Sequence, residues 1–208
     1  MVAFLAAVRD EHGLALSELN VGGGHAIAYH PGDVPLAPGD VHAALRRSLR
    51  AASAPHRLPI PRLTVEPGRA IAGPAGITVY RVLTVKHRAS RTWVAVDGGL
   101  SDNPRPALYG ARYTARLLGR LSPVVDEHVT VVGQHCEAGD VLIEDALLPS
   151  DIHAGDLLAV PSTGAYHHSM ASTYNLTPRP PVIGVSEGRS RVLVRRETVD
   201  DLLARDLG

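Results

Sequence analysis

The stretch ITVYRVLTVKHRASRTWVAVDGG, residues 77–99, decides the fold. It contains two short runs rich in β-branched residues and ends in Asp and Gly, which is the pattern of strands closed by turns. Further runs of this kind, each bounded by Gly, Pro, Asp or Asn, are HVTVVG (128–133), DVLIED (140–145), DLLAVPS (156–162), PVIGV (181–185) and RVLVRR (191–196). This spacing predicts a mostly antiparallel β domain over residues 75–208.

Residues 1–74 have a different texture. Helical spacing of apolar residues predicts a helix from Val2 to about Gly13 and a second from Val41 to about Ala52, with Asp40 as its N-cap. Strands are expected within 14–21 and 62–65, so this part reads helix, strand, helix, strand, as in βα units. At the other end of the chain, Thr198 with Asp201 three residues later predicts a capped closing helix.

The composition excludes several classes of protein. The 208 residues include 21 basic and 21 acidic side chains, so no basic footprint for nucleic acid or an anionic membrane is present. No apolar run approaches the roughly 18 residues of a membrane span. Cys136 is the single cysteine, which fits a reducing, cytoplasmic location. Lys86 is the single lysine, so any reaction that needs a lysine has one candidate.

Two glycine-containing turns at strand ends could bind an anion. Gly22, Gly23 and Gly24 can turn successive backbone N–H groups toward a phosphate, although the triplet equally fits a simple tight turn. The turn Glu66-Pro67-Gly68-Arg69 ends the next strand with a guanidinium suited to phosphate or carboxylate, or with a surface ion pair. Together they are stronger, because ligands bind at the C-terminal ends of parallel barrel strands.

Other candidates lie in the β region. Cys136 and Glu137 place a thiol beside a carboxylate in a turn, where the thiol is either an acid–base group or a small buried hydrophobe. Tyr166 follows a strand and either contacts a ligand or packs. Arg105 and Tyr109 would share a helix face and could hold a carboxylate, the alternative being an exposed arginine. The eleven histidines show no metal-ligand spacing, so no metal is expected.

In order along the chain, the motifs GGG (22–24), EPGR (66–69), VDGGLSDNPRPALYG (96–110), HCEAGD (135–140) and GAYHHSMASTYN (164–175) resemble the C-terminal half of the diaminopimelate decarboxylases. These are pyridoxal-phosphate enzymes of the alanine racemase-like fold. The resemblance implies an α/β plus β architecture: residues 1–74 would be the last βα units of a (β/α)₈ barrel, followed by the antiparallel β domain. Because about 250 residues are typical of a full barrel, these seventy or so cannot close one.

The resemblance also implies site residues. Gly22, Gly23, Gly24, Glu66, Pro67, Gly68 and Arg69 match positions that cradle the phosphate of pyridoxal 5'-phosphate. Arg69, Arg105 and Tyr109 match positions that bind substrate, meso-diaminopimelate, or the product L-lysine. Cys136 matches the proton donor after carbon dioxide leaves, and Glu137 the residue at the distal end of the substrate. Tyr166 matches a tyrosine that contacts both cofactor and substrate. Cys136 and Glu137 would reach into the other subunit of a homodimer.

Two departures accompany the resemblance. His25 stands where a smaller or aliphatic residue is expected and could crowd the phosphate turn. The Schiff-base lysine of the family has no match here, because Lys86 lies within an expected strand of the β domain. We therefore expect a diaminopimelate decarboxylase of lysine biosynthesis present as a truncated chain, inactive alone. The alternatives are a non-catalytic partner that docks on a full-length homologue through the dimer surface, and a remnant without function.

Overall fold

The computed structural model describes all 208 residues, which divide into two compact units. Unit 1 comprises residues 1–28 and 33–71, and unit 2 comprises residues 29–32 and 72–208. None of the helices combines the length and the apolar character that a membrane crossing requires.

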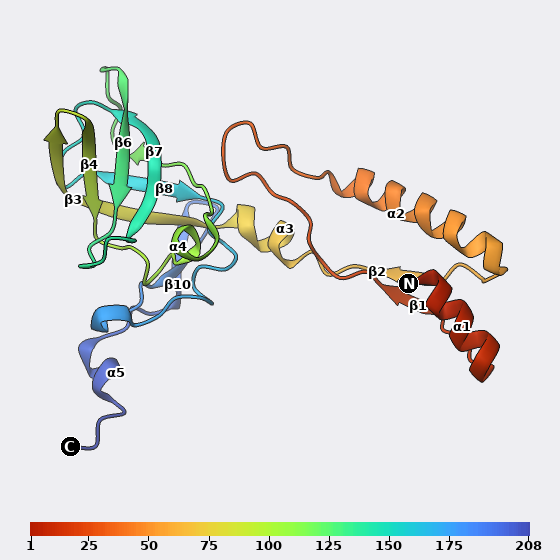
Figure 1. Cartoon of the computed structure of the whole chain (residues 1–208). Helices are drawn as coiled ribbons and strands as arrows, with labels where there is room; N and C mark the ends of the chain where they lie inside the picture. The colour runs from red at the N-terminus through yellow and green to blue at the C-terminus, as the bar shows by residue number, and fades with distance from the viewer. The chain divides into compact units, whose positions relative to one another are not determined.

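Unit 1 contains two long helices, two short helical segments and a two-stranded parallel sheet (Figure 1). Helix α1 (Val2–His12) ends at Gly13, which takes the left-handed conformation expected of a C-cap. Strands β1 (Glu18–Asn20) and β2 (Arg62–Thr64) pair in parallel, with α2 (Pro38–Ser53) between them in the chain. A small core holds them together, centred on Leu5, Leu19 and Leu49.

Helix α2 corrects one prediction. The helix begins at Pro38 with Ala37 as its N-cap, so Asp40 lies inside the first turn instead of capping it. Proline fits the first helical position because its fixed φ suits the helix and its missing N–H would have had no partner there. The carboxylate of Asp40 still lies near the positive end of the helix dipole. Unit 1 ends in the short 3₁₀ helix η1 (Ala54–His56), β2 and most of α3 (Gly68–Ala72).

Unit 2 is organised around a six-stranded sheet in the order β5-β8-β3-β4-β6-β7. The strands are β3 (Ile77–Arg88), β4 (Arg91–Val96), β5 (Arg116–Leu118), β6 (Asp126–Val132), β7 (Val141–Pro149) and β8 (Leu157–Pro161). All neighbours pair antiparallel except β4 and β6, which run parallel. The mostly antiparallel sheet predicted from the sequence is therefore confirmed, with one parallel pair inside it.

One continuous apolar core lies against this sheet. Alternate residues of the strands point inward, as the period of two in a pleated strand requires. Among the most deeply buried are Val82, Val94, Val131, Leu148 and Leu158. This core fixes the sheet from which the loops with the candidate site residues of unit 2 extend.

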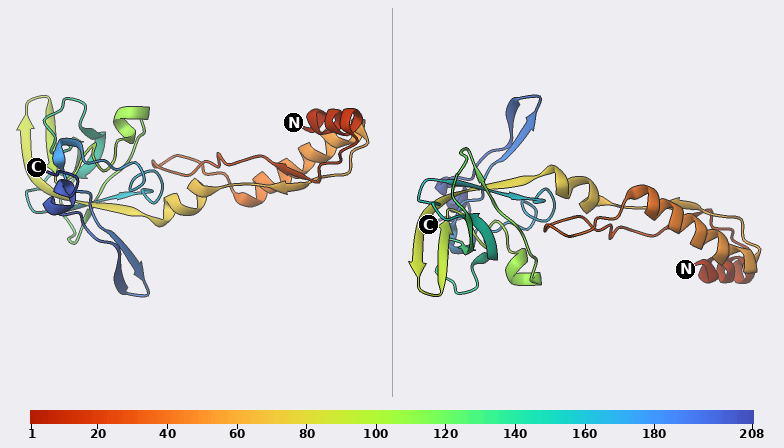
Figure 2. Two further views of the ribbon diagram at one scale, coloured as in Figure 1. Left: turned by 90° about the horizontal axis from the view of Figure 1, so that it is seen from below. Right: turned by 90° about the horizontal axis from the view of Figure 1, so that it is seen from above.

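The remaining elements of unit 2 are small. They are the 3₁₀ helices η2 (Gly73–Ala75) and η3 (Tyr174–Leu176), α4 (Arg105–Tyr109), the hairpin β9 (Val182–Ser186) and β10 (Arg189–Val194), and α5 (Val199–Leu203). Figure 2 shows the β9–β10 hairpin projecting from the six-stranded sheet. Thr198 and Asp201 form the predicted capping box at the start of α5.

Candidate functional site

In unit 1 the glycine turn and the turn after β2 are held together through the backbone. The N–H of Glu66 donates to the carbonyl of Gly22 at 2.7 Å. A Cβ atom on Gly23 would lie 2.5 Å from the carbonyl oxygen of Glu66, so only glycine allows this approach. The two strand ends that the sequence singled out are therefore brought into direct contact.

Side chains of the flanking residues fix the shape of the glycine turn. Asn20 accepts from the N–H of Gly22 at 2.7 Å and donates to the Glu66 carboxylate at 2.6 Å. Gly22 and Gly24 have φ of 72° and 93°, in the left-handed region that favours glycine. Such alternation lets neighbouring N–H groups point to one side, which is the arrangement of an anion nest. These residues thus fit a phosphate group.

The other residues predicted near the phosphate lie beside this turn. Pro67 and Gly68 lead into α3, and the half-buried Arg69 lies within that helix. His25 is half-buried directly after the glycines, and its Nδ1 atom is buried without a hydrogen-bond partner.

Unit 2 contains a cluster of aromatic side chains around one arginine, here called the Arg105 cluster and made of Tyr29, Arg105, Tyr113, Tyr166 and His167. The Nη1 atom of Arg105 donates to the hydroxyl of Tyr29 at 2.9 Å and to that of Tyr113 at 2.7 Å. The guanidinium also lies over the exposed ring of Tyr166, 5.6 Å from its centroid. Arg105 and Tyr166, predicted separately, are thus neighbours.

Burial shifts the ionisation of two members of the Arg105 cluster. It raises the pKa of Tyr113 to about 12, against the opposing effect of Arg105. It lowers the pKa of His167, and the charge of Arg105 acts in the same direction, so the imidazole is neutral. The His167 Nδ1 atom lies 3.0 Å from the Ala165 carbonyl and must donate to it, which leaves Nε2 as a buried acceptor without a partner.

Tyr109 lies apart from this cluster. Arg105 and Tyr109 begin and end α4, so the predicted helical segment is present. The Arg105 side chain is directed to the phenols, while the Tyr109 side chain is 67% exposed. The structure therefore does not join these two side chains.

Cys136 and Glu137 lie exposed in the turn of residues 133–140, here called the Cys136 turn. The Glu137 carboxylate accepts from the hydroxyl of Tyr174 at 3.4 Å, and the ring of His135 packs edge-on against Tyr174. Both predicted residues are thus accessible on one turn.

Buried Asp140 holds the Cys136 turn against the loop after β4. Its carboxylate accepts from the N–H of Leu100 at 2.7 Å and from the N–H of His135 at 2.8 Å. A Cβ on Gly133 would lie 2.1 Å from this carboxylate, so Gly133 must be a glycine. Only 3% of the surface of Asp140 is exposed. The turn that carries Cys136 is therefore anchored by a buried acid at its own C-terminal end.

A second buried acid fixes the same loop. Asp102 accepts from the hydroxyl of Tyr80 and from the N–H of Gly99. Burial raises the pKa of Asp102, although these hydrogen bonds oppose the shift. His135 extends the network through its Nε2 atom, which lies 2.9 Å from the Ser101 hydroxyl.

Sequence reasoning missed Tyr29, Tyr113, His167, Asp102 and Asp140. The only available signal was for Asp140 and Asp102, since each stands among glycines in a loop between apolar runs, where an acid can accept backbone N–H groups. Tyr29 offered no local signal, because its partner lies far along the chain.

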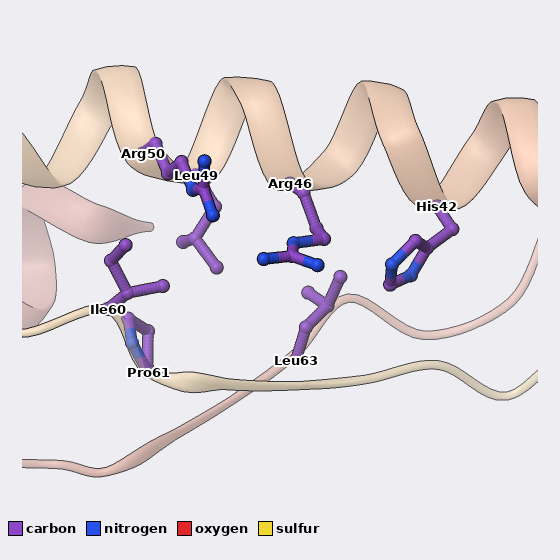
Figure 3. A pocket seen from close by; sticks show the side chains of 7 residues that line it. All are labelled: His42, Arg46, Leu49, Arg50, Ile60, Pro61 and Leu63. Atoms are coloured by element: carbon purple, nitrogen blue, oxygen red, sulfur yellow. The ribbon is translucent and has the colours of Figure 1, made fainter.

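Two further features of the chain stand outside these clusters. A groove of about 230 Å³ lies between α2 and β2, lined by His42, Arg46, Leu49, Arg50, Ile60, Pro61 and Leu63 (Figure 3). The single lysine, Lys86, is exposed on β3 opposite Trp93 of β4.

Over nearly its whole length the chain is similar in sequence to known decarboxylases. The diaminopimelate decarboxylase of Actinosynnema pretiosum is 56% identical over 198 residues, covering 94% of this chain and 44% of that protein. The enzyme of Mycobacterium tuberculosis is 47% identical over 197 residues, covering 92% and 44%. The chain thus spans a little under half the length of the curated relatives it matches.

Solved structures give the same result. Diaminopimelate decarboxylase from M. jannaschii in co-complex with L-lysine superposes with a TM-score of 0.91 at 30% identity, covering 99% of this chain and 46% of that one. The Helicobacter pylori enzyme complexed with L-lysine gives a TM-score of 0.84 at 30% identity, covering 98% and 48%. Residues 10–164 match the family described as pyridoxal-dependent decarboxylase, C-terminal sheet domain. The chain belongs to the pyridoxal-dependent decarboxylases and carries the C-terminal sheet domain of that family.

Proposed function

We propose that this chain supplies the C-terminal half of the active site of a diaminopimelate decarboxylase, which converts meso-2,6-diaminopimelate to L-lysine and carbon dioxide. The observation that carries the proposal is the backbone contact between the glycine turn and the Glu66 turn, where Gly23 admits no side chain. Residues 1–74 would end a (β/α)₈ barrel, and residues 75–208 would form the β domain.

The phosphate of pyridoxal 5'-phosphate would be held by the backbone of Gly22 to Gly24 and of the turn from Glu66 to Arg69. The N–H of Gly22 already donates to Asn20 and that of Glu66 to Gly22, so the N–H groups of Gly23 and Gly24 are the donors that the left-handed turn offers to the phosphate, with no side chain in the way. When bound, the cofactor accepts the electron pair left on the substrate carbon as carbon dioxide departs. Tyr166, exposed beside Arg105, is available to contact both cofactor and substrate.

The substrate would be held through its charged ends. The guanidinium groups of Arg69 and Arg105 suit a carboxylate, to which arginine can donate two parallel hydrogen bonds. Tyr109 is exposed and can add a phenol. The carboxylate of Glu137 suits the distal ammonium group. The two relatives solved with L-lysine support an amino-acid ligand of this length.

Cys136 would return the proton to the carbon that loses carbon dioxide. Its S–H bond breaks as the new C–H bond forms, which leaves a thiolate on the protein. The thiol is accessible because Cys136 is exposed, and its turn is held in place by the hydrogen bonds of the Asp140 carboxylate. Being exposed, Cys136 and Glu137 can also serve the site of the other subunit in a homodimer.

Lys86 does not suit cofactor attachment, because it is exposed on the β3–β4 hairpin opposite Trp93 and does not match the position of the family's Schiff-base lysine. The 208-residue polypeptide by itself is therefore expected not to decarboxylate meso-diaminopimelate. The lysine would come from barrel strands of the kind found in full-length relatives.

The test is a chimera in which this chain replaces the matching segment of the A. pretiosum enzyme. We expect the chimera to release carbon dioxide from meso-diaminopimelate, and Cys136→Ala to lower kcat by about 10²–10⁴-fold, as loss of a general acid does. The 208-residue chain alone, assayed in parallel, should show no turnover. A folded chimera that binds pyridoxal phosphate without turnover would contradict the proposed function, and turnover by the chain alone would contradict the role given to the missing lysine.

A second function, docking on a full-length homologue, is favoured by the exposure of Cys136 and Glu137. In this role the chain would donate the two side chains to the homologue's site, or block it. Co-elution with the A. pretiosum enzyme at micromolar concentration is expected if docking occurs. Separate elution would count against it.

A further inference from the structure

The two phenols that contact Arg105 both bind the same nitrogen. Tyr29 accepts from Nη1 at 2.9 Å and Tyr113 accepts from it at 2.7 Å. The fork of a guanidinium presents five N–H donors over three nitrogens. With Nη1 engaged, Nη2 and Nε form the edge that remains to bind a carboxylate side-on.

The phenols are themselves held in fixed orientations. The rings of Tyr29 and Tyr113 meet edge to face at 5.4 Å and 87°, a favourable aromatic geometry. Tyr113 is only 2% exposed, and its other side packs edge-on against His167 at 5.5 Å. The long, flexible side chain of Arg105 therefore donates its hydrogen bonds to two acceptors whose rings are packed against each other.

These contacts do not neutralise the positive charge of Arg105. Its hydrogen-bond acceptors are phenol oxygens and not carboxylates, and a pKa of about 12 keeps Tyr113 protonated over the physiological range. A carboxylate in their place would neutralise the guanidinium and compete with an anionic ligand. Phenols orient the group and leave its full charge to the ligand.

We propose that Tyr29 and Tyr113 are positioning residues that hold Arg105 with its Nη2–Nε edge presented to the carboxylate of an amino-acid substrate. The inference rests on the proposed function for the identity of the ligand, but not for the orientation of the side chain. It assigns a role in substrate binding to Tyr29, a residue that follows the glycine turn in sequence yet packs within unit 2.

The first measurement needs no ligand. In the ¹⁵N side-chain spectrum of the 208-residue chain, hydrogen bonds to Nη1 alone should hinder rotation of the Arg105 guanidinium and give separate Nη1 and Nη2 signals. We expect the double variant Tyr29→Phe/Tyr113→Phe to merge them. Tyr80→Phe is the control, since it removes a buried phenol hydrogen bond to Asp102 and costs stability without touching Arg105. Unchanged signals in the double variant, or merged signals in wild type, would overturn the proposal.

The second measurement asks whether orientation matters for binding. In the active chimera, each Tyr→Phe change should raise KM for meso-diaminopimelate about fivefold, the equivalent of one neutral hydrogen bond, with kcat nearly kept. Tyr80→Phe should leave KM unchanged. An unaltered KM in the double variant would also overturn the proposal. An inactive chimera with separate Arg105 signals in the isolated chain would instead count against the proposed function and support the orientation.

Discussion

Replacing Asp140 with asparagine should destabilise unit 2 by about 2 kcal/mol. The carboxylate accepts one N–H on each of its oxygens, from Leu100 at 2.7 Å and from His135 at 2.8 Å. Asparagine keeps the shape but turns one acceptor into an NH₂ group that faces a backbone donor. An unsatisfied buried donor costs about 1–3 kcal/mol, and a hydrogen bond to a charged group contributes about 1.5–3 kcal/mol. The neutral asparagine no longer carries the cost of burying a charge, which offsets part of the loss and leaves a net destabilisation of about 2 kcal/mol.

Trp93, the single tryptophan, lies on β4 of unit 2 and so reports on the unfolding of this unit. Urea unfolding followed by its fluorescence gives the free energy of unfolding from the midpoint and slope. Asp145→Asn is the matched control, because that side chain is 68% exposed and should change stability by less than about 0.5 kcal/mol. Amide exchange should accelerate at Leu100 and His135 first. If Asp140→Asn matches the control within error, the carboxylate does not hold the two loops together.

Four other outcomes follow from the geometry. Hydrogen bonds from Arg120 lower the pKa of Asp156, so ionisation of this carboxyl stabilises the folded protein. The difference in the free energy of unfolding between wild type and Asp156→Asn should therefore narrow as the pH falls below about 3.9. A constant difference in urea titrations would contradict this. The pKa of Tyr113 is raised to about 12, so ionisation of this phenol opposes folding. The free energy of unfolding should therefore fall between about pH 10 and pH 12, and should fall less in Tyr113→Phe. Alkaline titration followed by circular dichroism measures both. Native Cys136 should react with one equivalent of a thiol reagent without loss of tryptophan fluorescence; resistance until unfolding would mean that it is buried. Gly23→Ala should weaken inorganic phosphate binding, measured by ³¹P line broadening, whereas equal broadening in Gly39→Ala and Gly23→Ala would remove the case for a phosphate site.

Local features were predictable and distant pairings were not. Gly13 ended the first helix and Thr198 capped the last as expected, because such signals depend on the residue's own backbone preference. The short β-branched runs, each bounded by turn residues, likewise predicted the sheet. The parallel pairing of β4 with β6 escaped prediction, since hydrophobic alternation is the same for either strand direction.

The same distinction holds for the candidate site. Gly22 to Gly24 and Glu66 to Arg69 stood out by residue type, and the structure brings the two turns together. The hydrogen-bond partners of Arg105 did not stand out in the sequence, because Tyr29 lies 76 positions away and a lone tyrosine is most often a packing residue. Asp40 was misplaced as a cap because the proline two residues earlier already fits the first turn.

The chain passes between the two compact units after Ala28, after Gly32 and after Ile71. The sheet domain is therefore not one uninterrupted piece of the gene, since it takes Tyr29 from a segment encoded amid the helices of unit 1. A chimera of two related enzymes joined at residue 71 would take Arg105 and Tyr113 from one parent and the second phenol acceptor, Tyr29, from the other. Such a chimera keeps both phenol acceptors of Arg105 only when the parent that supplies residues 1–71 has a tyrosine at position 29.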